Sequence, residues 1–185
     1  MGTSVVSAKK ISSADLSTIT RAVETIRSEV SAENLQNAQE AEKISNVAVA
    51  NNSSVSAKVV RVVDGDTIVL DSGEKVRYIG VNTPELHHPQ KGVECFGKEA
   101  YERNKILVEG KVVQLQKDVS ETDRYGRLLR YVWVDGTLVN ESLVREGYAF
   151  AASFPPDIAM QKYFEVAQQT ARENRTGLWS SCPKN

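Results

Sequence analysis

The chain has 185 residues, and its 23 Lys and Arg against 24 Asp and Glu give a formal net charge of −1. With 41% hydrophobic and 25% charged residues, it has the composition of a globular protein, which excludes wholesale disorder and collagen-like repeats. The balanced charge excludes a protein that coats nucleic acid through bulk positive charge alone. No apolar run approaches the ~18 residues of a membrane span. The sequence also shows no secretory signal, which would combine a basic start with an apolar run.

The composition divides the chain into two parts, residues 1–57 and 58–185. The first part has no aromatic residue and no proline, and it is rich in Ser, Ala, Asn, Glu and Gln. The second part holds every aromatic residue and both cysteines. Because a packed core needs large apolar side chains, we predict one folded domain over residues 58–182, followed by a short tail at 183–185.

A narrow apolar stripe in the first part is typical of a helix. Its members recur every three or four residues: Ile19, Val23, Ile26 and Val30. The stripe lacks the Leu-rich heptads of a strong coiled coil, and residues 51–54 have the composition of a linker. We predict a helical segment with a linker over residues 1–57. An oligomerising or docking helix and a disordered segment are the alternatives.

The second part contains short β-rich runs separated by turns, and three longer stretches of helical composition. The expected strands are 59–63, 67–70, 76–79, 112–115 and 128–134, and the expected helices are 96–108, 139–146 and 157–174. Asp135-Gly136 is a tight hairpin signal, and Asp157 is a candidate cap for the last helix. Because strand follows strand, a doubly wound sheet is disfavoured. We predict an α+β fold that is mainly a β barrel, a five-stranded OB-fold barrel with three helices.

Oxygen-bearing side chains stand at the ends of the first three expected strands: Asp64, Asp66, Asn82 and Glu85. If these strands are neighbours, the oxygens converge on one rim of the sheet. A hard divalent cation such as calcium or magnesium prefers oxygen ligands without sulfur, and Pro84 restrains the bend that carries them. The alternative is that Asp64-Gly65-Asp66 is only a hairpin turn and Asn82-Thr83-Pro84 only a loop, although a turn alone does not need carboxylates at both ends.

Arginines form a second candidate set. Arg77 lies within an apolar strand, where a guanidinium needs an anion or several acceptors. The loop before the fifth strand places Arg124 and Arg127 around Tyr125. Arginine binds phosphate oxygens through two parallel hydrogen bonds, so these arginines beside metal-holding carboxylates would make a phosphodiester-cleaving site. The alternative is a set of ion pairs across a barrel.

Several motifs, in their order along the chain, resemble the staphylococcal nuclease-like (thermonuclease) family between Lys58 and Ser180. They are Val63-Asp64-Gly65-Asp66-Thr67, Arg77, Val81-Asn82-Thr83-Pro84-Glu85, Gly92-Val93-Glu94, Phe96-Gly97 with Glu99-Ala100, Thr122-Asp123-Arg124-Tyr125-Gly126-Arg127, Val139 to Arg145, and Leu178-Trp179-Ser180. The resemblance implies an OB barrel with three helices. It also implies an enzyme that uses calcium to hydrolyse DNA and RNA with low sequence specificity, as an endonuclease or an exonuclease.

The resemblance further implies a role for each matching residue. It implies these calcium ligands: Asp66, Asn82 and the carbonyl oxygen of Thr83, with Asp64 supporting the metal site. Glu85 resembles the residue that activates the attacking water. Two groups resemble those that bind phosphate: Arg77 and Arg127 at the reacting phosphate, and Arg124 and Tyr125 at the neighbouring one.

Three features depart from the family pattern. Asn82 stands where an aspartate is usual, so calcium affinity should fall, or magnesium or another divalent ion would be preferred. Residues 151–156 lack the family's pair of tyrosines that stack on the base and bind the terminal phosphate, and they offer only Phe154. Arg124 replaces a lysine, which keeps the positive charge.

Cys95 and Cys182 are the only cysteines in the chain. In some relatives that look secreted, cysteines near these positions are paired, and Trp179 should pack back on the body of the domain. The resemblance therefore implies a Cys95–Cys182 disulfide and an extracellular or cell-envelope location. The alternative is a reduced and partly buried pair.

Two further alternatives concern function. His87 and His88 suggest zinc, but adjacent residues rarely both ligate one ion, so we expect a solvated loop near the substrate cleft. The rival to an enzyme is a catalytically weak nuclease-like domain that acts as a nucleic-acid or protein binding module. Retention of the candidate carboxylates and arginines favours the enzyme, whereas Asn82 favours the rival.

Overall fold

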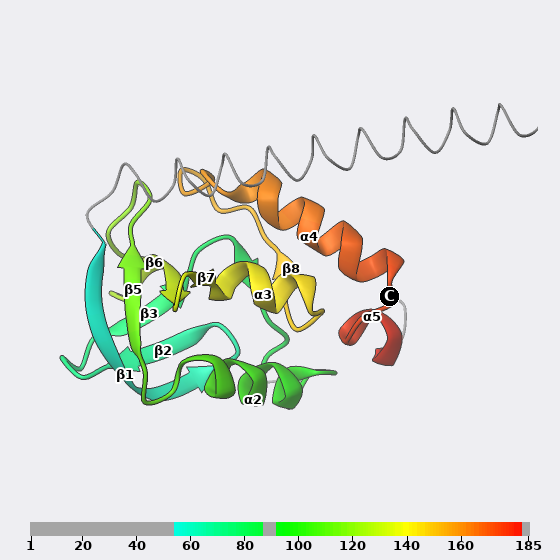
Figure 1. Ribbon diagram of the computed structural model, residues 1–185, viewed down its shortest axis with the longest axis horizontal. Helices are drawn as coiled ribbons and strands as arrows, with labels where there is room; N and C mark the ends of the chain where they lie inside the picture. Colours follow the sequence, from blue (N-terminus) through cyan, green and yellow to red (C-terminus); the bar gives the residue numbers. More distant parts are fainter. Residues whose placement is uncertain (1–53, 87–91, 183–185) are drawn as a thin grey trace, which may run out of the picture. The chain divides into compact units, whose positions relative to one another are not determined.

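Five strands close into a barrel in the computed structural model of the chain, which describes residues 54–86 and 92–182 (Figure 1). They are β1 (Val55–Asp64), β2 (Thr67–Leu70), β3 (Lys75–Tyr78), β5 (Val112–Gln116) and β6 (Leu128–Val134). Antiparallel pairs give the order β3-β2-β1-β5-β6, and parallel pairing of β3 with β6 closes the ring. This topology confirms the predicted five-stranded OB-fold barrel.

The first strand begins earlier than its β-rich run indicates. β1 begins at Val55 rather than at residue 59, so it crosses the predicted boundary between residues 57 and 58. The compact unit that contains the barrel extends from Asn52 to Asn185. The predicted N-terminal helix, nearly all of its linker, the His87-His88 pair and the tail at 183–185 lie outside the described residues.

The hairpin signal at Asp135-Gly136 is confirmed. These two residues form the whole connection between β6 and β7 (Thr137–Leu138), because Val134 pairs directly with Thr137. Their φ angles are 50° and 77°, as the preferred two-residue hairpin turn requires.

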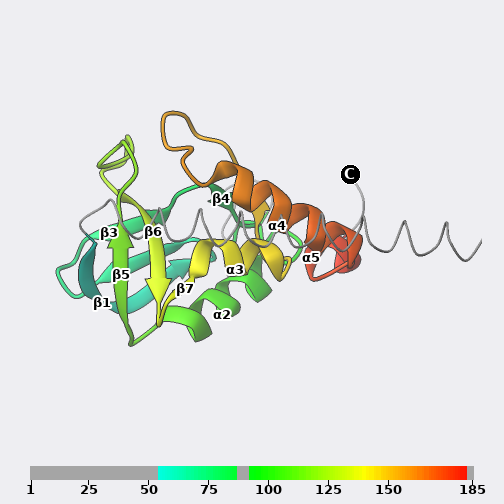
Figure 2. The same ribbon diagram turned by 45° about the horizontal axis from the view of Figure 1, so that its top comes forward.

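Three helices follow the predicted stretches, and a short fourth one was not predicted. They are α2 (Gly97–Val108), α3 (Val139–Arg145), α4 (Gln161–Glu173) and the short α5 (Leu178–Ser181). In Figures 1 and 2, α3 lies between α2 and α4. Within the described ranges, no helix is both long and apolar enough to cross a membrane.

The predicted capping role of Asp157 is wrong. α4 begins at Gln161, with Met160 at its N-cap. The Oδ1 atom of Asp157 instead accepts hydrogen bonds from the backbone N–H groups of Val119 and Ser120, at 3.0 and 2.7 Å. These partners lie far away in sequence, so no local pattern indicates them. The bonds tie the loop before α4 to the loop before β6.

A small second sheet lies beside the barrel. β4 (Val81–Asn82) pairs with β8 (Phe150–Ala151), which sets Asn82 opposite Phe150. Strands of two residues carry no readable alternation, so neither was predicted. Their pairing fixes the extended backbone that leads from β3 to the Thr83-Pro84 bend.

Asn140, at the start of α3, is a fully buried polar residue. Its Nδ2 donates to the carbonyl oxygen of Ile79 at 2.9 Å, and its Oδ1 accepts from the backbone N–H of Val132 at 2.9 Å. One side chain therefore joins α3 to β6 and to the turn that follows β3. Both backbone partners would lose their hydrogen bonds if the amide were removed.

Replacing Asn140 by alanine is expected to lower the free energy of unfolding by about 2–4 kcal/mol, since each unpaired buried polar group costs roughly 1–3 kcal/mol. Urea denaturation of the variant and the parent measures this difference. Asn174→Ala is the control, because Asn174 is exposed after α4 and should change stability by less than about 0.5 kcal/mol. A loss below about 1 kcal/mol for Asn140→Ala would contradict the assigned bridging role.

Candidate active site

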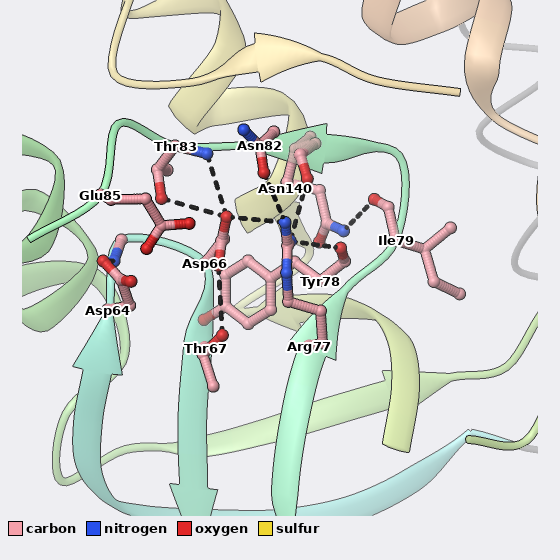
Figure 3. Close-up of polar contacts among 12 residues, drawn as sticks. Asp64, Asp66, Thr67, Arg77, Tyr78, Ile79, Asn82, Thr83, Glu85 and Asn140 are labelled. Atoms are coloured by element: carbon pink, nitrogen blue, oxygen red, sulfur yellow. Dashed lines mark hydrogen bonds and ion pairs between the residues drawn. The ribbon is translucent and has the colours of Figure 1, made fainter. Parts of the chain in front are cut away.

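Asp66 lies in the turn between β1 and β2, and it is nearly buried, with 5% of the residue exposed. Its Oδ2 accepts hydrogen bonds from the backbone N–H and the hydroxyl of Thr83, both at 3.0 Å. Its Oδ1 accepts from the hydroxyl of Thr67 at 3.1 Å (Figure 3). Two segments distant in sequence, the β1–β2 turn and the chain after β4, therefore meet at this carboxylate.

The approach of these two segments depends on Gly65. A Cβ atom at this position would lie 2.7 Å from the Cβ and Oγ1 atoms of Thr83. Such contacts are too close for packed atoms, so only glycine lets Thr83 reach Asp66 here. The Asp-Gly-Asp motif is thus more than a hairpin turn.

The guanidinium of Arg77 lies inside the group of oxygens. Its Nη2 is 3.0 Å from the Oδ2 of Asp66 and donates to the Oδ1 of Asn82 at 2.9 Å. Its Nη1 donates to the carbonyl oxygens of Tyr78 and Val81, at 3.0 and 2.9 Å. These acceptors explain how β3 tolerates a charged side chain, as the sequence indicated.

The oxygens of Asp66, Asn82 and Thr83 suit a hard divalent cation by their chemistry. They comprise one carboxylate, one amide oxygen and one peptide carbonyl, with no sulfur or nitrogen ligand. In the part of the chain that the structure describes, no three His, Cys, Asp or Glu side chains form a group that could hold a metal ion. A cation would thus rely on few charged ligands, and it would compete with Arg77 for Asp66 and Asn82.

Glu85 and Asp64 lie next to each other beside Asp66 (Figure 3). The pKa of Glu85 is raised to about 7, mainly by burial. A hydrogen bond with Asp64 and the negative charges of Asp64 and Asp66 also raise this pKa, whereas the positive charge of Arg77 lowers it. A carboxyl group with a pKa near neutrality can accept and release a proton at physiological pH. The structure therefore brings a candidate proton acceptor to the Asp66–Arg77 pair.

Two asparagine side chains that were not predicted support these residues. Asn104, buried in α2, donates from Nδ2 to the carbonyl oxygen of Asp64 at 3.0 Å and accepts from the Tyr78 hydroxyl at 2.9 Å. Asn140 holds the turn after β3, as described above. The available sequence signal was helical spacing: Asn104 lies four residues from Ala100 and from Val108, and Asn140 lies three and four residues before Leu143 and Val144. Each amide thus falls on an apolar helix face, where it must find buried partners.

A third residue for which no site role was predicted is Glu94, which contacts the main chain of Glu85. The Oε2 atom of Glu94 accepts from the backbone N–H of Glu85 at 3.0 Å, and its own N–H donates to the Glu85 carbonyl at 2.9 Å. The Gly92-Val93-Glu94 motif is part of the resemblance to the family, but it did not indicate this contact.

The other predicted phosphate-binding residues form a separate cluster before β6. Asp123 organises it: Oδ2 lies 2.7 Å from Nε and 2.6 Å from Nη2 of Arg127, and Oδ1 accepts the backbone N–H groups of Tyr125 and Arg127. Tyr125 is 68% exposed. The guanidinium carbons of Arg124 and Arg127 lie 4.8 and 5.5 Å from its centre.

The two clusters are neighbours through the parallel β3–β6 pair. Val76 pairs with Leu128 at the start of β6, and Arg127 directly precedes Leu128, so the pairing brings Arg127 close to the strand that carries Arg77. Over the described ranges, no hydrogen bond or ion pair joins Arg127 to Asp66, Asn82 or Glu85. The structure thus brings Arg77 into the carboxylate group and leaves Arg127 paired with Asp123.

The remaining predicted residues lie at the periphery. Phe154 is 53% exposed, in the loop that Asp157 fixes. Cys95 and Cys182 form a disulfide with a Cα–Cα distance of 5.9 Å. Trp179 packs against the ring of Phe150, with centroids 5.3 Å apart, so the end of the chain does return to the body of the domain.

Comparison with known proteins agrees with this architecture. Residues 75–181 match the family of staphylococcal nuclease homologues. The thermonuclease of Staphylococcus hyicus is 40% identical over 136 residues, which cover 72% of this chain and 80% of the relative. The thermonuclease of Staphylococcus intermedius is 39% identical over 124 residues, which cover 65% of this chain and 74% of the relative. Endonuclease YncB of Bacillus subtilis is 40% identical over 131 residues, which cover 68% of this chain and 62% of the relative. The chain therefore belongs to the staphylococcal nuclease family.

Proposed function

We propose that the protein is a metal-dependent phosphodiesterase that hydrolyses DNA and RNA with low sequence specificity. The observation that carries this proposal is the grouping of Asp66, Arg77, Asn82, Thr83 and Glu85 on the rim of the barrel. Relatives named thermonuclease and endonuclease support the reaction class.

The cation would be held by the Asp66 carboxylate, the Asn82 amide oxygen and the Thr83 carbonyl, with Asp64 in support. Calcium is the first candidate, and magnesium or another divalent ion is the second, because Asn82 contributes no charge. When bound, such a cation supplies positive charge that offsets the charge growing on the phosphoryl oxygens.

The chain's own residues divide the remaining work. Glu85 accepts the proton of the attacking water, which its pKa near neutrality favours. Arg77 and Arg127 offset the negative charge of the phosphoryl oxygens and the leaving group through paired hydrogen bonds. Arg124 and Tyr125, in the exposed cluster, bind the neighbouring phosphate.

For Arg77 to bind phosphate, its guanidinium must exchange partners. Nη2 now donates to Asp66 and Asn82, which are the proposed cation ligands. Phosphate oxygens would replace these acceptors, and the two ligands would become free for the cation. We therefore expect substrate and cation to strengthen each other's binding.

The alternative function is a catalytically weak domain that binds nucleic acid or protein. One observation favours it: Asn82 leaves a single carboxylate, Asp66, among the proposed direct ligands. A docking or oligomerising role for the N-terminal segment, the alternative to a helix with a linker, is compatible with either function. An extracellular or cell-envelope location is supported by the Cys95–Cys182 disulfide, because disulfides persist in oxidising compartments.

Release of acid-soluble nucleotides from single-stranded DNA and from RNA tests the function. We expect cleavage in calcium and loss of cleavage when a chelator removes the cation. Cleavage in magnesium but not in calcium would keep the enzyme and assign the altered cation preference to Asn82. No cleavage in any divalent ion, by a folded protein that still binds DNA, would contradict the proposal and favour the binding module.

A further inference from the structure

The backbone of Glu85 is held by Glu94, a residue nine positions later in the chain. Glu94 accepts its N–H through Oε2 at 3.0 Å and donates to its carbonyl oxygen at 2.9 Å. Both backbone polar groups of Glu85 are therefore bound to a single residue. The first of these bonds comes from a side chain, so it is open to substitution without a change in the main chain.

Glu94 is itself fixed by the beginning of α2. Its carbonyl oxygen accepts the backbone N–H of Gly97 at 2.9 Å. Gly97 also packs directly against the Glu85 peptide, because a Cβ atom there would lie 2.6 Å from the Glu85 carbonyl oxygen. A helix whose residues Ala100 and Asn104 are fully buried thus provides a rigid support for both glutamates.

A covalent bond anchors the same segment at the next residue. Cys95 is joined to Cys182, which follows α5, and α5 lies close to the beginning of α2 (Figure 1). α5 is held in turn at Gly147, whose carbonyl oxygen accepts the N–H of Leu178 at 2.9 Å. The chains approach so closely here that a Cβ on Gly147 would lie 2.2 Å from the carbonyl oxygen of Thr176.

We propose that Glu94 is a positioning residue that fixes the Glu85 peptide, and that the Cys95–Cys182 disulfide holds Glu94 in place. This inference rests on the proposed role of Glu85 as the proton acceptor. A proton acceptor is effective only when its carboxylate is held at the reacting water, and small misplacements cost large factors in rate. Glu94 is a positioning residue in this role, because its effect on the reaction is exerted through the backbone of Glu85.

Glu94→Ala and Glu94→Gln test the side-chain contact. Alanine should lower kcat on single-stranded DNA on the order of 10-fold to 100-fold, with KM changed less than about twofold, since substrate contacts remain. Glutamine keeps an acceptor oxygen for the Glu85 N–H and should restore most of kcat. Glu99→Ala is the matched control, because Glu99 is exposed in the first turn of α2 and should behave as the parent.

The Glu85→Gln background separates positioning from general structural damage. If Glu94 acts through Glu85, then Glu94→Ala should cause no further loss of kcat once the proton acceptor has gone. Equal losses in both backgrounds would overturn the inference, because they would mean damage to the site as a whole. A Cys95→Ala/Cys182→Ala variant, assayed well below its unfolding temperature, should show the same kcat-selective loss and the same dependence on Glu85.

The outcomes distinguish the two proposals. Parent-like kcat in Glu94→Ala, beside a strongly impaired Glu85→Gln, would overturn the positioning role and leave the proposed function standing. A fully active Glu85→Gln would overturn both. Parent-like kcat in the variant without the disulfide, with an impaired Glu94→Ala, would overturn the anchoring by Cys95 and Cys182.

Discussion

Replacing Glu85 by glutamine is expected to lower kcat on single-stranded DNA by a factor on the order of 10²–10⁴, the range typical of a lost general base. Glutamine has nearly the same shape but cannot accept a proton from water. The two hydrogen bonds between Glu94 and the backbone of Glu85 do not involve the Glu85 side chain, so this change leaves them in place. Initial rates at saturating calcium, with kcat and KM measured separately, give the result, and KM should change little.

Loss of folding would not account for this effect. The pKa of Glu85 is raised from 4.5 to about 7 in the folded protein, first by burial and then by Asp64 and Asp66. Stability is therefore lost as the pH rises from about 4.5 through 7, while the carboxyl ionises. Glutamine does not ionise, so without cation the variant should be at least as stable as the parent at pH 8. A variant that is less stable at pH 8 would contradict the raised pKa of Glu85. A variant that retains the parental kcat would contradict its role as the proton acceptor.

Local patterns were sufficient for most of the barrel. The β-rich runs and the Asp135-Gly136 pair act over a few residues, so the sequence indicated the strands and the hairpin directly. The position of Asp157 was not predictable in this way, because its partners Val119 and Ser120 belong to another loop. β4 and β8 exist only because they pair with each other, and strands of two residues leave no periodic signal.

In the candidate site too, local patterns indicated some residues, whereas contacts between distant segments could not be predicted. Residues at the ends of neighbouring strands, such as Asp66 and Asn82, could be grouped from their spacing alone. The position of Arg77 between them depends on where a long side chain finds its acceptors. The contact of Glu94 with Glu85 joins residues nine positions apart, and the support of Asp64 by Asn104 joins β1 to α2. Such contacts are set by tertiary packing, which a single sequence does not reveal.

Removing the guanidinium of Arg77 is the second substitution with a large expected effect. Arg77→Ala should lower kcat/KM at saturating calcium on the order of 10²–10³, as the loss of one donor to a developing oxyanion does elsewhere. Arg77→Lys should recover only part of this loss, because an ammonium cannot form two parallel bonds to phosphate. Arg103→Lys is the matched control, because it also breaks a paired contact, with Glu146 at 2.6 and 2.9 Å. This contact joins α2 to the residue after α3, so kcat/KM should change less than about twofold.

Calcium binding should change in the opposite direction. Arg77 now occupies the oxygens of Asp66 and Asn82, so its removal frees both proposed ligands and removes a nearby positive charge. Calorimetric titration of Arg77→Ala should therefore show tighter calcium binding than the parent, while catalysis is weaker. If calcium affinity and kcat/KM instead fell together, Arg77 would act by maintaining the metal site, and its proposed contact with the phosphate would be wrong.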